Sequence, residues 1–383
     1  MFIIIAIITI LLAILYAILI SYFNLGWSRL SEFVPESSIP PNVSFSIIIP
    51  ARNEELNIIN CLNDIINQEY PSSKFEIIVI DDFSEDKTAE NVDQFISNNP
   101  KYNVSLIRLS EEKSEELNSF KKFAITIGIK QSGYDWIITS DADCRHGKKW
   151  LSTIAAFIVQ NDPILISAPV TFQNPSNFFE KSQSLEFLGL IAIGAASIAN
   201  KSANLCNGAN LIYKKDAFYE VGGFKGVDDI ASGDDEFLMH KIHAKWPDKI
   251  AFLKSHDAIA YTQPAKTLSE FIQQRKRWVS KSRKYANKSI TGILISAYLY
   301  HLCLLLCLVF GFCNPLYFIV FIVAFGFKVV VEFLFLKKVT KFFNQSNVIR
   351  LLVPSAFLYI IYVLFIGIYG NFGKYEWKGR RVK

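Results

Sequence analysis

Long apolar stretches at both ends of the chain flank a central region in which apolar and polar residues alternate. Residues 2–23 contain no charged side chain and have the length of a bilayer-spanning helix. Three more apolar stretches cover residues 292–312, 316–336 and 351–369. The pattern predicts an N-terminal transmembrane anchor at 1–24, a linker at 25–43, a soluble domain at 44–285, a C-terminal membrane region at 286–371 and a basic tail at 372–383.

A cleavable signal peptide is the alternative for the first stretch. No basic residue precedes it, its apolar run is too long, and no small-x-small cleavage site follows it. We therefore expect an uncleaved anchor.

The central region predicts alternating strands and helices. Five short apolar runs end abruptly in polar residues, and helical spacing lies between them, as in Leu56, Ile59, Leu62 and Ile66. The five runs are residues 45–50, 75–82, 104–109, 136–141 and 164–169. Such an alternation predicts an α/β fold, with an open, mostly parallel sheet and helices on both faces. Ligands bind such sheets beyond the carboxyl ends of the strands.

Charges near the C-terminal apolar stretches bear on membrane topology. Lys328 and Glu332 lie one turn apart and either pair within the bilayer or leave Lys328 to extend toward the interface. The positive-inside rule assigns both the basic loop at 337–350 and the basic tail to the cytosol. One crossing cannot join two cytosolic ends, so the third stretch is re-entrant or one of the three lies flat on the surface. We expect a multi-pass protein of the inner or plasma membrane with a cytosolic catalytic domain.

Composition narrows the class of partner. Hydrophobic residues make up 51% of the 383 residues, and the net charge of +5 fits anionic lipid headgroups or phosphorylated ligands, or a near-neutral soluble protein. The basic residues are scattered, so no nucleic-acid partner is expected. The six cysteines include no CxxC pair, which argues against a disulfide framework or a zinc site and favours a reducing compartment.

Polar clusters follow two of the predicted strands. Pro50, Arg52 and Glu54 end the first strand and open a helix, where backbone N–H groups can meet a nucleotide. Asp81 and Asp82 end the second strand, where their carboxylates can accept hydrogen bonds from a nucleobase or a ribose. Ordinary helix capping explains both clusters as well.

A D-x-D sequence, Asp141-Ala142-Asp143, follows the fourth predicted strand. Two carboxylates leaving a sheet together can share a nucleotide diphosphate and its divalent ion. Oxygen ligands that leave room for phosphate and water suit Mg²⁺ or Mn²⁺. Acidic pairs of this kind are also common on protein surfaces.

Three consecutive acids, Asp234, Asp235 and Glu236, form a later cluster. They repel each other, so at least one should have a raised pKa or a positive partner. A carboxylate in this position can act as general base on an acceptor hydroxyl. An acid-rich helix N-terminus facing solvent is the structural alternative.

A fifth cluster lies in an apparent helix that begins near Thr267. Gln274, Arg277 and Trp278 share one face of it, where Arg277 can bind a diphosphate and Trp278 can stack on a sugar ring. A basic amphipathic helix lying on the membrane fits the same residues.

In chain order these motifs resemble those of the family-2 glycosyltransferases, above all the membrane-bound branch with cellulose synthase, hyaluronan synthase and ceramide glucosyltransferase. The family's acidic pair, DxD, second acidic pair and QxxRW correspond to Asp81–Asp82, Asp141-Ala142-Asp143, Asp234–Asp235 and Gln274–Trp278. Lys121-Lys122-Phe123-Ala124 and Asn207-Gly208-Ala209-Asn210 are subsidiary matches, although Phe120 stands where the family has a glycine before the lysine. The resemblance covers about residues 44–285.

The resemblance implies a nucleotide-diphosphosugar transferase fold, an inverting mechanism and a divalent cation, Mg²⁺ or Mn²⁺. By position, Asp235 matches the family's general base and Asp143 its metal ligand. The nucleotide-sugar contacts would be Pro50, Arg52, Glu54, Asp81, Asp82, Lys121 and Asp141, and the acceptor and diphosphate contacts would be Asp234, Gln274, Arg277 and Trp278.

We therefore predict a hexosyltransferase that uses a nucleotide sugar, a UDP-sugar by expectation, and a lipid or lipid-linked glycan acceptor at the membrane. One N-terminal and at most three C-terminal helices offer little material for a polysaccharide channel in a monomer. This favours single transfer over a processive polysaccharide synthase. A non-catalytic membrane scaffold or a transporter fits the intact acidic motifs less well, and the donor sugar, the acceptor and the oligomeric state stay open.

Overall fold

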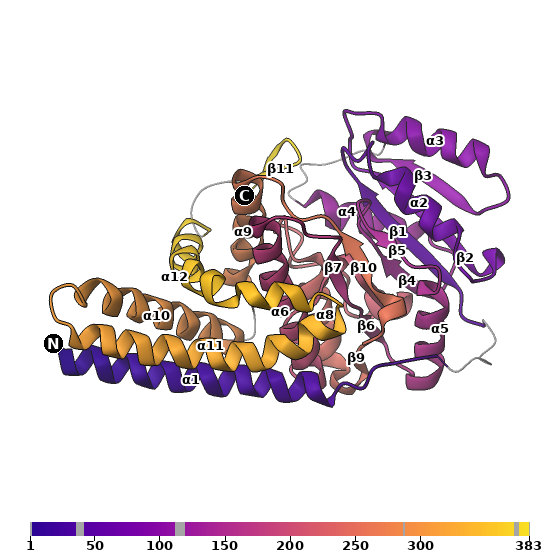
Figure 1. Cartoon of the computed structure of the whole chain (residues 1–383). Coiled ribbons are helices and arrows are strands. Elements are labelled where there is room, and N and C mark those ends of the chain that lie inside the picture. Colours follow the sequence, from indigo (N-terminus) through magenta and orange to yellow (C-terminus); the bar gives the residue numbers. More distant parts are fainter. Residues whose placement is uncertain (1, 36–41, 112–118, 286–287, 371–374, 383) are drawn as a thin grey trace. The chain divides into compact units, whose positions relative to one another are not determined.

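The computed structural model describes residues 2–35, 42–111, 119–285, 288–370 and 375–382, which divide into two compact units (Figure 1). The helical unit contains Met1–Ser28, Asn174–Ala196 and Pro264–Trp377. The α/β unit contains Arg29–Gln173, Ser197–Gln263 and Lys378–Lys383.

A seven-stranded sheet forms the centre of the α/β unit. In spatial order its strands are β3 (Val104–Arg108), β2 (Phe75–Asp81), β1 (Phe45–Ala51), β4 (Trp136–Thr139), β8 (Leu211–Lys214), β6 (Leu165–Ser167) and β9 (Ile250–Phe252). Only β8 runs antiparallel to its neighbours, and the other pairings are parallel. The predicted mostly parallel sheet is therefore confirmed. The five predicted strands begin within one residue and end within two residues of the observed ones.

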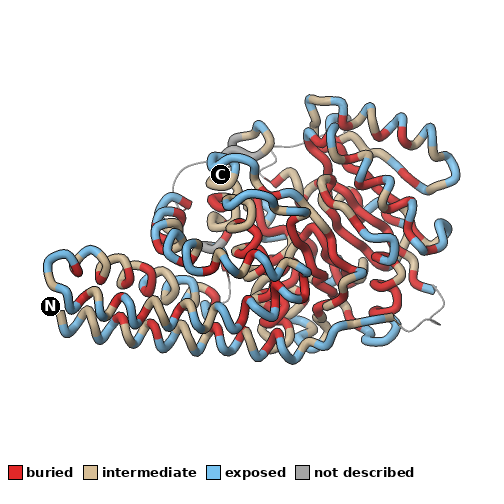
Figure 2. Tube along the Cα trace, in the orientation of Figure 1, coloured by how far each residue is buried: buried red, intermediate tan, exposed pale blue. Residues whose placement is uncertain are grey.

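Helices cover both faces of this sheet. They are α2 (Ile58–Ile66), α3 (Thr88–Asn98), α4 (Phe120–Gln131), α5 (Trp150–Asn161), α7 (Lys215–Glu220) and α8 (Asp234–Lys245). Successive side chains of a strand point to opposite faces, so Ile47 and Ile49 join one buried cluster with α2 and α5. Ile48 points toward α4. Gly128 of this helix comes so close that a Cβ atom on it would lie 2.7 Å from Cγ2 of Ile48. Figure 2 shows the strands buried along their length.

A small second sheet stands beside the end of β4. Its strands are β5 (Arg145–His146), β10 (Ala260–Thr262) and β7 (Val170–Phe172), with β10 in the middle. Near the C-terminus, β12 (Arg380–Val382) belongs to the α/β unit, and β11 (Tyr375–Trp377) belongs to the helical unit.

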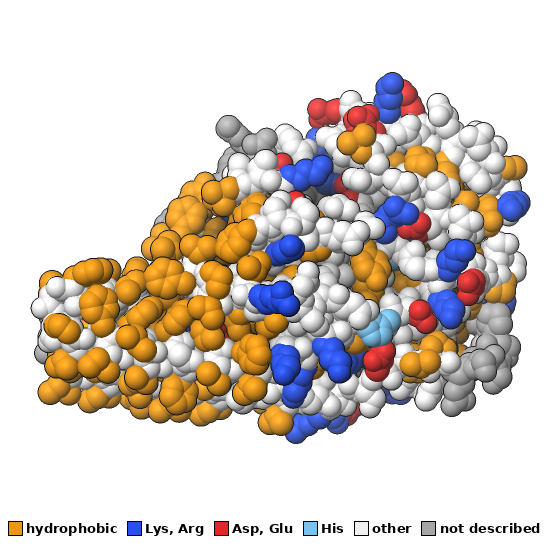
Figure 3. Space-filling view, in the orientation of Figure 1, with side chains coloured by type: hydrophobic (Ala, Val, Ile, Leu, Met, Phe, Trp, Pro, Cys, Tyr) orange, Lys and Arg blue, Asp and Glu red, His pale blue; other side chains and the backbone are white. Residues whose placement is uncertain are grey.

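The helical unit is built from α1 (Phe2–Arg29), α6 (Phe178–Ala199), α9 (Leu268–Ser280), α10 (Lys288–Phe310), α11 (Leu316–Phe342) and α12 (Leu352–Tyr369). Five described helices are long and apolar enough to cross a membrane: α1, α6, α10, α11 and the segment Ser346–Tyr369, which contains α12. Four of them match the predicted apolar stretches. Large apolar side chains lie exposed along α1, α10 and α11 (Figure 3), as expected for surfaces that contact lipid.

The charged couple within α11 is an ion pair. The Nζ atom of Lys328 lies 2.6 Å from Oε1 of Glu332, and only 1% of the Lys328 side chain is exposed. Tyr16 of α1 donates a hydrogen bond to the same carboxylate oxygen. Of the two possibilities for Lys328, the pair is the one that forms.

Candidate active site

The acidic clusters that follow β1, β2 and β4 meet at one edge of the sheet. These strands are adjacent and parallel, with β1 between the other two. The chain moves from β1 to β2 and β3 on one side and then returns to β4 on the other, so β1 and β4 flank a topological switch point. Ligands bind open α/β sheets at such points.

Asp81 and Asp82 carry buried oxygens that face no protein donor. Asp82 continues the β2 edge through a 2.8 Å hydrogen bond from its backbone N–H to the Ala51 carbonyl. Within the described part of the chain, Oδ1 of Asp81 and Oδ2 of Asp82 are buried without a hydrogen-bond partner. Burial raises the pKa of Asp82, although Arg380 and Arg52 act in the opposite direction. Buried acceptors of this kind are normally hydrogen-bonded, so these two oxygens are available to accept hydrogen bonds from a ligand.

Arg52 connects the turn after β1 to the turn after β2. It is only 4% exposed, and it donates to the Asp82 carbonyl at 3.0 Å and to the Glu85 carboxylate at 3.0 Å. Asn53 and Phe83 hold these two turns with positive φ angles of 51° and 52°. Arg52 therefore fixes the loops that carry the acidic pair. Pro50 lies inside β1, level with Ile80 of β2.

The D-x-D carboxylates face different partners. Asp141 accepts a 2.7 Å hydrogen bond from Lys121, and Asp143 accepts one at 3.0 Å from the Thr262 hydroxyl at the end of β10. Burial, followed by repulsion from Asp141 and Glu54, raises the pKa of Asp143 from 3.8 to about 6. Asp143 thus sits in a strongly negative environment, which favours a cation beside it.

Lys121, at the start of α4, joins two of the motifs. Its Nζ atom lies 2.7 Å from Asp141 and 3.6 Å from Asp234. The neighbouring Lys122 donates to the carbonyls of Val227, Ile230 and Ser232 and so holds the loop that leads into α8. The predicted positive partner of the acidic triplet is therefore Lys121, on Asp234.

Asp235 is fixed by two backbone N–H groups. Gly208 donates to its Oδ2 at 2.9 Å, and Glu236 donates to its Oδ1 at 2.8 Å. Gly233, just before α8, has a φ of +80°, which L side chains rarely adopt. A Cβ atom on Gly208 would lie 3.2 Å from Asp234 Oδ2, a tight contact that would require the Asp234 side chain to shift by a few tenths of an ångström.

The fifth motif belongs to the helical unit, whereas the other predicted site residues belong to the α/β unit. Helix α9 begins after Thr267, whose hydroxyl accepts from the Glu270 N–H at 3.2 Å. The Arg275 guanidinium donates to the Gln274 side chain and lies 4.2 Å from the centre of the Trp278 ring. Arg275 therefore contacts two of the three predicted motif residues.

One hydrogen-bond partner of Arg275 was not predicted from the sequence. Glu186 of α6 accepts from Arg275 at 2.7 Å and 3.1 Å, and it also accepts from the Tyr362 hydroxyl at 3.0 Å. The signal available in the sequence was an acidic residue within the apolar run at residues 185–193 of this helix.

Two more residues missed by sequence reasoning come from the basic tail. Lys378 forms an ion pair with Glu54, and Arg380 forms one with Asp82 at 2.8 Å. They lie about 300 residues from these partners, and no local pattern pointed to the contact.

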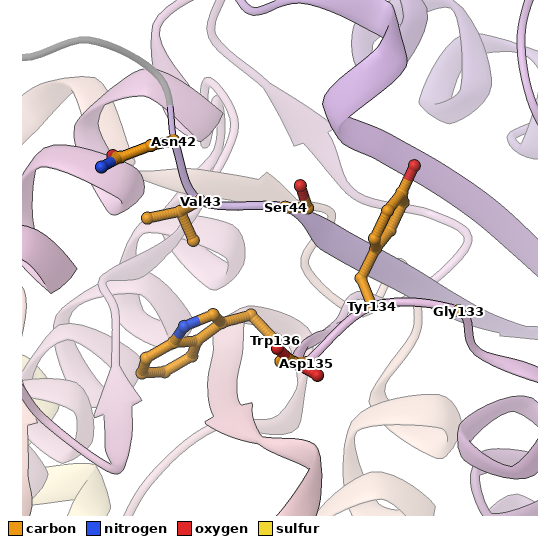
Figure 4. Close-up of a pocket in the computed structure, with 7 residues that line it drawn as sticks. All are labelled: Asn42, Val43, Ser44, Gly133, Tyr134, Asp135 and Trp136. Atoms are coloured by element: carbon orange, nitrogen blue, oxygen red, sulfur yellow. The ribbon is translucent and has the colours of Figure 1, made fainter.

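A separate pocket lies at the other end of the sheet. It is lined by Asn42, Val43, Ser44, Gly133, Tyr134, Asp135 and Trp136, which precede or open β1 and β4 (Figure 4). These are the amino ends of parallel strands, away from the carboxylates. The pocket contains none of the predicted site residues.

Within the described residues no group of three or more His, Cys, Asp or Glu side chains is arranged to hold a metal ion.

The sequence matches two family profiles. "Glycosyl transferase family 2" covers residues 46–222, and "Glycosyl transferase family group 2" covers residues 136–369, more than half of the chain. Both matches include the D-x-D sequence, and the second also includes the acidic triplet and the α9 motif.

Two curated relatives are each more than a quarter identical to this chain over the aligned residues. The glycosyltransferase AglE of Haloferax volcanii is 28% identical over 232 residues, which cover 61% of this chain and 70% of AglE. The poly-beta-1,6-N-acetyl-D-glucosamine synthase of Staphylococcus epidermidis is 27% identical over 243 residues, which cover 61% of this chain. The chain spans only 53% of the length of that synthase.

A solved structure has the same fold. The mannosyltransferase PcManGT from Pyrobaculum calidifontis, in complex with GDP-Man and Mn²⁺, superposes with a TM-score of 0.54 at 16% identity. The match covers 94% of this chain and 99% of that one. At this identity the likeness concerns the fold alone.

Proposed function

The chain belongs to glycosyltransferase family 2, and on that premise we propose that it is a membrane-anchored, inverting enzyme with a nucleotide-diphosphate sugar as donor and a lipid or lipid-linked glycan as acceptor. One observation carries the proposal: the carboxylates after β1, β2 and β4 converge at the switch point of the sheet. A UDP-sugar is our expected donor.

The proposed nucleoside contacts are Asp81 and Asp82. Each has a buried carboxylate oxygen without a partner among the described residues, and N–H or O–H groups of a nucleobase or ribose would satisfy both. Pro50, Arg52 and Glu54, at the end of β1 and in the turn after it, are also proposed to contact the nucleotide sugar. The same role is proposed for Lys121 and Asp141, which form an ion pair with each other.

The residues present fit a divalent cation at Asp143. A buried carboxylate with a pKa raised to about 6 by burial and by Asp141 and Glu54 is stabilised by a nearby positive charge. Bound Mg²⁺ or Mn²⁺ would offset the charge that develops on the departing diphosphate. The Thr262 hydroxyl orients the Asp143 carboxylate.

Asp235 is the proposed general base. Its carboxylate takes the proton of the acceptor hydroxyl while the acceptor oxygen bonds to the anomeric carbon and the carbon–phosphate oxygen bond breaks. The two N–H groups that hold the Asp235 oxygens keep the carboxylate from rotating between turnovers. Asp234, paired with Lys121, is proposed to contact the acceptor or the diphosphate.

The helical unit supplies the proposed acceptor contacts and the membrane attachment. Gln274, Arg277 and Trp278 of α9 are proposed to bind the acceptor and the diphosphate. The apolar surfaces of α1, α10 and α11 support attachment to the membrane. We propose that residues 44–285 form a cytosolic catalytic domain at the inner or plasma membrane.

The test is release of nucleoside diphosphate by the full chain purified in detergent. A panel of UDP- and GDP-sugars is offered with Mg²⁺ or Mn²⁺ and a membrane lipid extract. We expect metal-dependent turnover with one donor, reduced about 10²- to 10⁴-fold in Asp235→Asn, the range that a general base contributes. Asp143→Asn should lose most metal-dependent activity.

Asp248→Asn is the matched control. It exchanges an exposed aspartate paired with Lys201 in the same unit and should keep full activity. A folded wild-type protein that neither binds nor turns over any donor would contradict the proposal and favour a scaffold.

A processive polysaccharide synthase is the second candidate. The match to the poly-beta-1,6-N-acetyl-D-glucosamine synthase favours it, although this chain spans about half of that protein. The length of a radiolabelled product distinguishes the two functions, since single transfer adds one sugar and a synthase makes a polymer.

A further inference from the structure

The end of the chain occupies the proposed nucleoside site. Arg380 donates to Oδ1 of Asp82 at 2.8 Å and to the Asp82 carbonyl at 3.0 Å. Lys378 pairs with Glu54, and its carbonyl accepts from Nε of Arg52 at 3.0 Å. All these residues belong to the α/β unit, and Asp82 and Glu54 are only 2% and 7% exposed. These contacts tie residues 378–380, here called the tail segment, to both acidic turns.

Arg380 has the contacts that a nucleobase would make. Its guanidinium is planar, donates N–H groups to a carboxylate, and lies 3.9 Å from the centre of the Phe120 ring and 5.3 Å from that of Phe83. A base held by the Asp82 carboxylate and stacked on the Phe120 ring would contact the same carboxylate and the same ring as Arg380.

Lys378 supplies positive charge to the other acidic turn. Its ammonium group pairs with the Glu54 carboxylate in the turn after β1. The tail segment therefore places one planar cation on Asp82 and one ammonium group on Glu54.

We propose that the tail segment is an intramolecular competitor of the nucleotide-sugar donor, which must leave Asp82 and Glu54 before the donor binds. The inference rests on the proposed function, because it takes Asp82 as a nucleoside contact. Buried Asp82 and Glu54 keep counter-ions while the site is empty of donor, and the donor with its cation replaces them. Product release is then assisted by return of the tail segment.

Binding of UDP and of GDP to the full chain tests this without any turnover. Isothermal titration with Mn²⁺ present compares wild type with Lys378→Met/Arg380→Met. If the tail segment covers the site in about nine molecules of ten, the double variant should bind the nucleotide about tenfold more tightly. Arg380→Lys keeps the charge but not the planar stacking group, so it should fall between the two.

Lys201→Met/Lys245→Met is the matched control. It removes two cations from surface ion pairs of the same unit and should bind as wild type does. Thermal unfolding of every variant checks that it is folded. If the double variant is unstable, the nucleotide affinity of Arg380→Lys tests the proposal in its place.

The possible outcomes separate the two proposals. Tighter binding in the double variant supports competition. Equal or weaker binding overturns it while leaving the transferase in place, and weaker binding would make Lys378 and Arg380 donor ligands. No binding in any protein, together with no donor turnover, overturns both the competition and the proposed function.

Discussion

The two units treat buried charge differently. In the α/β unit the carboxylates at the strand ends are incompletely matched: Asp81 and Asp82 keep oxygens without described partners, and like charges surround Asp143. In the helical unit Arg275 pairs with Glu186, and Lys328 pairs with Glu332. Incomplete matching leaves room for a ligand's charges, whereas closed pairs hold helices together. The contrast predicts that the two units respond differently to substitution of a buried charge.

Removing one member of a closed pair should have the largest effect on stability. Glu186→Gln leaves the 2%-exposed Arg275 without its counter-ion, which should cost about 3–5 kcal/mol. Thermal unfolding in detergent measures it. Glu180→Gln is the control, since Glu180 lies on the same helix, is not buried and accepts hydrogen bonds only from the N–H and hydroxyl of Ser176 among the bonds described for its carboxylate. Equal melting temperatures for the two variants would remove the distinction between the units.

Removing a carboxylate that lacks a matching positive charge should instead stabilise the fold. The folded-state pKa of Asp143, about 6, lies above its ordinary value of 3.8, so ionisation destabilises the fold. This destabilisation is absent below pH 4, grows as pH rises and is complete above pH 6. Asp143→Asn should therefore stabilise the metal-free protein by about 1–3 kcal/mol at pH 7.5 and by little at pH 4.

Thermal unfolding of Asp143→Asn across this pH range, in the presence of a chelator, checks the sign. Asp248→Asn again serves as the control. A variant that is less stable than wild type at pH 7.5 would show that Asp143 is matched within the protein itself.

Replacing both members of a closed pair should have the smallest effect. Lys328→Met with Glu332→Gln removes the ion pair but keeps an acceptor for Tyr16, so stability should change by less than about 1 kcal/mol. Donor turnover should also be unchanged. A large loss of turnover with a normal melting temperature would give this pair a role in the chemistry.

Much of the α/β unit was predictable because the patterns that specify its strands involve residues close together in the sequence. Short apolar runs that end in polar residues specify strands, and parallel strands bring their carboxyl ends to one edge, so Asp81 and Asp141 were expected near each other. The reversed direction of β8 was not predicted. Strand direction depends on how the chain returns to the sheet, and this leaves no mark in the strand's own four residues.

The sequence by itself determined five strands of the main sheet, the order of the acidic motifs, the family and the apolar stretches, because periodicity and motif spacing are properties of neighbouring residues. Only the tertiary structure decided which charges are matched. Lys121 on Asp141 and Asp234, Glu186 on Arg275, and the tail segment on Glu54 and Asp82 join residues far apart in the chain. Such pairs form where packing excludes water and brings opposite charges together, and no local pattern along the chain records that.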